Sequence, residues 1–118
     1  MAIQSYRDLV AWQKAMELAE TVYHFSQHFP ECERFGLTNQ IRRAGVSVPS
    51  NIAEGQGRGS AADFNRFLGI ANGSRQEIET QATLAFRLGF ATEQSLQTVI
   101  CQTEELGRVL TGLRRSLG

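Results

Sequence analysis

The sequence of 118 residues is poor in several residue types, and each shortage limits what the chain can be. It has two prolines, two cysteines, one tryptophan and a single lysine, Lys14, beside eleven arginines. Asp and Glu together equal Lys and Arg at 12 each, so the formal net charge is zero. A neutral chain lacks the excess positive charge on which non-specific nucleic-acid binding depends. The sequence also lacks a long uncharged apolar run, so no membrane span is expected.

The few cysteines and histidines form no pattern typical of a metal site. Cys32 and Cys101 lack Cys-x-x-Cys spacing and are expected to be reduced thiols of a cytoplasmic protein. Neither His24 nor His28 follows an acidic residue three positions earlier, as the Glu-x-x-His motif of di-metal bundles requires. No Ser, Cys or Thr has a base arranged to activate it. We therefore predict no metal, no cofactor and no enzymatic activity.

Hydrophobic residues recur at helical spacing in four segments. These segments span residues of about 6–28, 35–54, 61–88 and 93–117. No segment has the alternating pattern of a strand. Because the connections are short, the sequence predicts one all-α domain, an antiparallel up-down-up-down four-helix bundle.

The ends of these segments carry residues that start and stop helices. Ser5 and Ser60 are each followed by Asp three residues later, which is a capping-box pattern. Gly89 is suited to a left-handed cap after the third helix, and Thr92 is suited to cap the fourth. The fourth helix has an uninterrupted seam typical of coiled-coil-like packing, made of Leu96, Val99, Thr103, Leu106, Leu110, Leu113 and Leu117.

The first helix carries more hydrophobic residues than one core requires. One row consists of Leu9, Trp12, Met16, Ala19 and Tyr23. A second row beside it consists of Ala11, Ala15, Leu18, Val22, Phe25 and Phe29. Together the rows cover about half of the helix circumference, whereas a single core needs a stripe of about 100°. Because soluble monomers rarely expose large apolar patches, the excess predicts a homo-oligomer.

The second helix contains a glycine and a proline at helical spacing. Pro49 has no N–H, so the carbonyl of Gly45 loses its helical partner and a kink is expected. The side chain of Ser50 or Asn51, which follow the proline, is expected to hydrogen-bond to a freed carbonyl. The kink would aim one face at a neighbouring subunit, so Val46, Pro49 and Ala53 are the predicted oligomer interface.

Charged residues also lie where a core is expected. Arg75 projects toward the core side of the third helix, with Glu79 four residues later. A buried charge requires a partner, because an unpaired one is strongly destabilising. We predict a polar network between the second and third helices, made of Arg43, Ser47, Asn51, Glu54, Arg75 and Glu79. Such a network serves either as a binding pocket or as a device that fixes the helix register.

Scattered arginines raise the alternative of RNA binding. The candidate contacts are Arg42, Arg43, Arg58 and Arg66. The competing explanation is a set of surface ion pairs. Glu54 and Arg58 are four residues apart in the favourable order, and Glu104 precedes Arg108 in the same way.

Three stretches resemble a known family over about residues 5–90. They are "SYRDLVAWQKAMELA", "FGLTNQIRRAGVSVPSNIAEGQGR" and "FNRFLGIANGSRQEIETQ". They are similar to the four-helix-bundle family of 23S rRNA intervening-sequence proteins. This resemblance implies a bundle that assembles into a ring, commonly a homopentamer. The accessory proteins of diversity-generating retroelements, which bind a reverse transcriptase and RNA, resemble this chain in fold.

The leading functional prediction is a non-enzymatic, homo-oligomeric helical bundle that acts as a scaffold or adaptor. The alternative is an accessory protein that binds RNA or a reverse transcriptase. A ring face that collects the candidate arginines would favour the alternative, because phosphate contacts need clustered positive charge.

Overall fold

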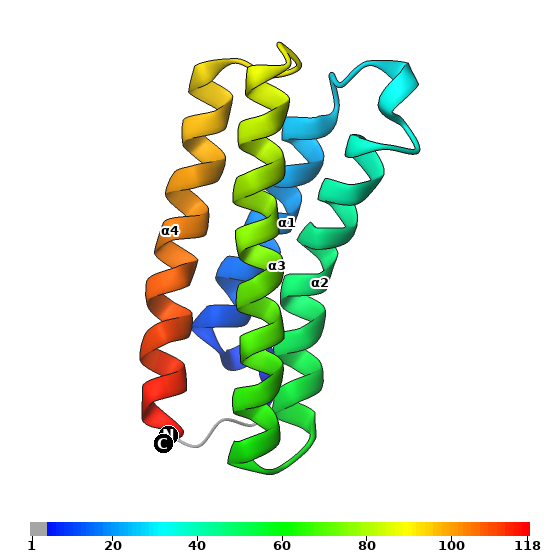
Figure 1. Ribbon diagram of the computed structural model, residues 1–118. Coiled ribbons are helices and arrows are strands. Elements are labelled where there is room, and N and C mark those ends of the chain that lie inside the picture. Colours follow the sequence, from blue (N-terminus) through cyan, green and yellow to red (C-terminus); the bar gives the residue numbers. More distant parts are fainter. Residues whose placement is uncertain (1–4) are drawn as a thin grey trace.

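The computed structural model describes residues 5–118, and these residues form four packed α-helices and two short 3-10 helices (Figure 1). The long helices are α1 (Val10–Ser26), α2 (Leu37–Gly57), α3 (Ala61–Arg87) and α4 (Glu93–Ser116). The short helices are η1 (Tyr6–Asp8), before α1, and η2 (Glu31–Glu33), between α1 and α2. No strand occurs in the described part of the chain, so the all-α, four-helix prediction is confirmed.

Each long helix packs on two others and encloses a common core. Helices α1 and α3 both contact α2 and α4. No helix within residues 5–118 is long and apolar enough to cross a membrane. The largest fully buried hydrophobic side chains come from all four helices, and they are Leu18, Val22, Ile41, Val48, Ile52, Leu68, Ile78, Val99, Leu106 and Leu110. Burial of each such side chain contributes about 1.5–3 kcal/mol, which makes this core the main source of stability.

Most helix ends follow the predicted capping residues. The Ser60 hydroxyl accepts a hydrogen bond from the Asp63 N–H at 3.2 Å, and the Thr92 hydroxyl accepts one from the Ser95 N–H at 3.1 Å. Gly89 has a φ of +83°, the left-handed conformation predicted for the end of α3. The capping box at Ser5 also forms, but it caps the 3-10 helix η1, and α1 begins only at Val10.

The end of α2 differs from the prediction, because Gly55 lies inside the helix. A Cβ atom added at Gly55 would lie 2.6 Å from the Cβ of Phe67 in α3. Gly55 is buried, and its missing side chain lets the two helices approach closely. The helix therefore continues through Gly57 instead of ending at residue 54.

The helix α2 also continues across Pro49, and this proline is buried. At Gly45 an added Cβ would lie 3.4 Å from Val22 Cγ1 and 3.7 Å from the Cα of Ala19, so this glycine faces α1. Pro49 follows one turn later on the same side of α2. Contrary to the prediction of an oligomer contact, Pro49 packs inside its own bundle and has little surface to offer a neighbour. Val46 remains 46% exposed.

Candidate functional site

The α2–α3 part of the predicted polar network consists of short hydrogen bonds. The hydroxyls of Ser47 and Ser74 lie 2.8 Å apart and join the two helices. Asn51 Nδ2 donates to the Ser47 hydroxyl at 2.9 Å and to the Ser47 carbonyl at 2.8 Å. Asn51 thus serves the carbonyl of Ser47, not the carbonyl of Gly45 that Pro49 leaves free.

Arg75 and Glu79 pair as predicted, but they connect α3 to α4. Arg75 Nη1 donates to Glu79 Oε2 at 2.9 Å and to the Thr103 carbonyl at 3.2 Å. Glu79 Oε2 also accepts from the Thr103 hydroxyl at 2.7 Å, and Thr103 is fully buried in α4. Arg75 Nε donates to Asn72 Oδ1 at 2.9 Å, so this guanidinium is held from three sides.

The predicted single network is therefore two separate groups. Ser47 and Asn51 belong to the α2–α3 group, and Arg75 and Glu79 belong to the α3–α4 group. Glu54 joins neither, since it pairs with Arg58 at 3.1 Å on the exposed surface. Arg43 is exposed and lines a hollow of about 400 Å³ between α2 and α3 with Ser47, Ser74 and Gln81, among others.

Sequence reasoning missed the contribution of α4 to the Arg75 pair. Thr103 is the polar member of the seam of α4, and Gly107 follows it one turn later. An added Cβ at Gly107 would lie 2.8 Å from Arg75 Cζ, so the glycine makes room for the guanidinium. A threonine and a glycine on the inner side of an otherwise leucine-rich helix were the available signal.

A second arginine is held against a glycine between the same two helices. Arg114 Nε donates to Asn65 Oδ1 at 2.8 Å. An added Cβ at Gly69 would lie 3.3 Å from Arg114 Nη2. Each of α3 and α4 thus contributes one arginine that lies over a glycine of the other helix.

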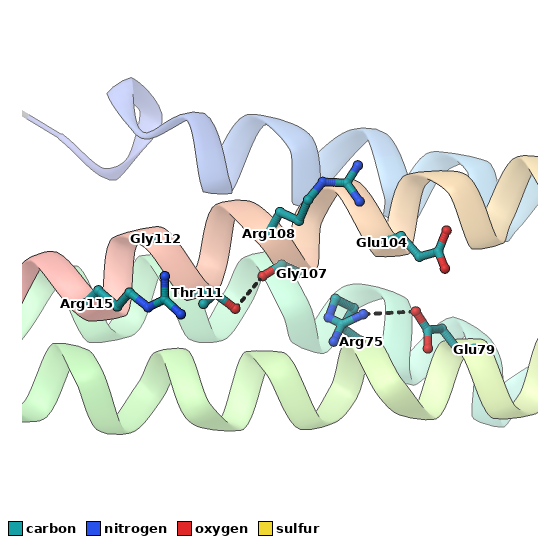
Figure 2. Close-up of a pocket in the computed structure, with 8 residues that line it drawn as sticks. All are labelled: Arg75, Glu79, Glu104, Gly107, Arg108, Thr111, Gly112 and Arg115. Carbon is teal, nitrogen blue, oxygen red and sulfur yellow. Dashed lines mark hydrogen bonds and ion pairs between the residues drawn. The ribbon is translucent and has the colours of Figure 1, made fainter.

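Beside the Arg75–Glu79 pair, α3 and α4 form an open groove of about 680 Å³ (Figure 2). Its lining consists of Arg75, Glu79, Glu104, Gly107, Arg108, Thr111, Gly112 and Arg115. The expected Glu104–Arg108 ion pair is not among those formed by residues 5–118, and Figure 2 shows the two side chains apart. The sequence did not predict this polar groove.

The four arginines predicted to contact RNA do not form one cluster. Arg42 Nε donates to the Ser26 hydroxyl at 2.8 Å, and its guanidinium lies 4.7 Å from the Tyr23 ring centre. Arg58 and Arg66 both lie over the Phe67 ring, at 5.0 and 4.6 Å. Arg43 and Arg58, the residue that caps the end of α2, are fifteen positions apart, which is about 22 Å along the helix axis. The candidate contacts therefore occupy two separate places.

The outer edge of α1 and α2 carries uncovered hydrophobic side chains. Tyr23 is 45% exposed, Val46 is 46% exposed and Met16 is 37% exposed. Tyr23 and Val46 line the same hollow of about 510 Å³, together with Arg42. We call the residues Trp12, Met16, Tyr23, Val46 and Ala53 the α1/α2 edge. Of the interface predicted from the sequence, Val46 and the half-buried Ala53 lie on this edge.

An ion pair on the surface connects α1 to α4. Lys14 Nζ donates a short hydrogen bond to Glu105 Oε1. This hydrogen bond raises the pKa of Lys14 above 10.5 and lowers the pKa of Glu105 below 4.5. Within residues 5–118, no group of three or more His, Cys, Asp or Glu side chains is placed to hold a metal ion. Cys32 and Cys101 are exposed free thiols.

Comparison with known proteins identifies relatives of the whole bundle. The profile of the 23S rRNA-intervening sequence protein family matches residues 7–112. A crystal structure of a protein of unknown function from the S23 ribosomal protein family of Bacteroides thetaiotaomicron is similar, with a TM-score of 0.82 and 26% sequence identity. The similarity covers 89% of this chain and 98% of that one. No protein of curated function matches the chain. The chain belongs to the family of 23S rRNA-intervening sequence proteins.

Proposed function

We propose that this protein is a non-enzymatic scaffold whose copies associate through the α1/α2 edge. In this proposal the building block is an antiparallel up-down-up-down bundle, and several bundles close into a ring. The family resemblance implies that this ring contains five subunits. The observation that carries the proposal is that Met16 and Tyr23 of α1, which are large hydrophobic side chains, remain partly exposed.

The two hydrophobic rows of α1 have different surroundings. Ala15, Leu18 and Val22 of one row are fully buried in the bundle core. In the other row, Met16 and Tyr23 are 37% and 45% exposed. Leu9 and Ala19 of this row are buried, so its exposed part consists of Met16 and Tyr23. A second copy placed on this edge would bury these two side chains and gain their transfer free energy.

Helix α2 extends the same edge. Val46 lies beside Tyr23 in one hollow, and Ala53 continues the edge two turns along α2. The edge therefore presents side chains from two helices. An interface of standard size buries about 800 Å² on each partner, which is more than one helix usually supplies. Apolar patches of this kind are typical of surfaces that contact other proteins.

The test is the association state of variants that place charge on the edge. We expect Tyr23→Glu with Val46→Glu to sediment as a monomer, since burying two unpaired carboxylates opposes association. Leu84→Glu is the matched control, because Leu84 is also 46% exposed but lies on α3. Analytical ultracentrifugation should find the control in the same assembly as the unmodified protein. An edge variant that still assembles like the unmodified protein would rule out the α1/α2 edge as the interface.

Binding of RNA or of a reverse transcriptase receives less support. Three of the four candidate arginines, Arg42, Arg58 and Arg66, already have partners within the bundle. The net charge is zero, and the candidates lie at two separate places. Phosphate binding relies on clustered, uncommitted positive charge.

A further inference from the structure

We propose that the groove between α3 and α4 binds an acidic segment of a partner protein. The carboxylates of that segment would contact Arg108 and Arg115. This inference goes beyond self-association and does not depend on it, because α1 and α2 contribute no residue to the groove.

The charges of the groove divide into committed and uncommitted groups. Arg75 and Glu79 neutralise each other, and both also bond within the bundle. The guanidiniums of Arg108 and Arg115 make no hydrogen bond or ion pair with residues 5–118. Arg108 only adds, after Lys14, to the lowering of the pKa of the exposed Glu105. Two exposed guanidiniums are thus available to a ligand. Guanidinium groups bind carboxylates in a bidentate geometry, which favours an acidic partner.

The shape of the groove suits a chain that lies along α4. Gly112 has open space where a side chain would stand, since an added Cβ there would meet no atom within 4 Å. The Thr111 hydroxyl donates to the Gly107 carbonyl at 2.8 Å and so turns toward its own helix. Arg108 and Arg115 are seven residues apart, which is about 10.5 Å along a helix axis. On a peptide in the polyproline II conformation, side chains three residues apart lie on the same face and are separated by about 9 Å.

The composition of the groove favours a peptide over a nucleic acid. Figure 2 shows Glu104 near one end of the groove and Arg115 at the other. A uniformly charged phosphate backbone would meet repulsion from the Glu104 carboxylate, whereas a peptide can place a basic residue there. No aromatic side chain lines the groove, although single-stranded nucleic acids are usually held by base stacking. An acidic peptide with one basic end is therefore the ligand whose charges match.

The experiment measures binding of a fluorescent synthetic peptide by anisotropy at low ionic strength. The probe has glutamate at every third position and a lysine at one end, and the matched probe has glutamine in place of glutamate. We expect saturable binding of the glutamate probe only. Arg108→Gln combined with Arg115→Gln should weaken it about tenfold, the effect of two exposed ion pairs. Arg43→Gln combined with Arg66→Gln removes the same charge elsewhere and should leave the affinity unchanged.

A second variant separates loss of binding from loss of folding. Gly112→Leu adds a side chain in the open groove and replaces a residue of poor helix propensity, so the variant is expected to fold and to lose the probe. The proposal is overturned if the glutamate probe does not bind, or if it binds all variants equally. It is also overturned if single-stranded RNA binds more tightly than the glutamate probe and depends on Arg108 and Arg115.

Discussion

Replacement of Gly55 by alanine is a direct test of how closely α2 and α3 pack. The added methyl group would lie 2.6 Å from the Cβ of Phe67 and 3.3 Å from Cδ1 of Phe64. Phe67 is only 6% exposed, and its Cβ is fixed to the backbone, so α3 itself must shift. Overpacking of this kind costs about 3 kcal/mol at its upper range. The better helix propensity of alanine returns about 1 kcal/mol, so a net loss of about 2 kcal/mol is expected.

Thermal unfolding followed by circular dichroism measures this loss. A domain of this length has an unfolding entropy near 0.25 kcal/mol/K, so Gly55→Ala should lower the Tm by about 8 °C. Gly73→Ala in α3 is the control, because an added Cβ there meets no atom within 4 Å. The control should gain about 0.5–1 kcal/mol from helix propensity alone. If Gly55→Ala were stabilised to the same extent as the control, the close approach of α2 and α3 would be refuted.

Two further predictions concern charged residues. Glu79→Ala should lower stability by about 1–2 kcal/mol, since it leaves Arg75, whose side chain is 13% exposed, without its carboxylate partner. Glu54→Ala removes only an exposed ion pair and should change stability by less than about 0.5 kcal/mol. Urea titrations of both variants measure the two losses of stability, and equal losses would contradict this account. The Lys14–Glu105 hydrogen bond lowers the pKa of Glu105 and raises that of Lys14, so its stabilisation is complete between pH 4.5 and 10.5. It is lost as the pH falls through the lowered pKa of Glu105 or rises through the raised pKa of Lys14. The Tm difference between the unmodified protein and Glu105→Gln should therefore disappear in acid, and a difference that is constant with pH would contradict the assignment.

The sequence predicted those features that depend on neighbouring residues along the chain. The caps at Ser60 and Thr92 and the left-handed Gly89 are local, and each forms as expected. The buried seam of α4 from Leu96 to Leu110 follows from helical periodicity in the same way. Local hydrogen bonds and hydrophobic spacing were therefore sufficient for the helices and most of the core.

Features that depend on contacts between helices were harder to predict. Gly55 resembles the start of a flexible turn in the sequence, and only the position of Phe67 reveals it as a packing glycine. The sequence placed Arg75 in a network between the second and third helices, and this was wrong, because its guanidinium bonds to the Thr103 carbonyl of α4. The choice of α4 depends on Thr103 and on the space above Gly107, which are distant in sequence.

The assembly of copies through the α1/α2 edge is the central claim, and the solution mass of the unmodified protein tests it most directly. Sedimentation equilibrium over a range of protein concentrations should give a mass that is a multiple of the 13.1 kDa subunit. A single species of 13.1 kDa at every concentration would contradict the claim.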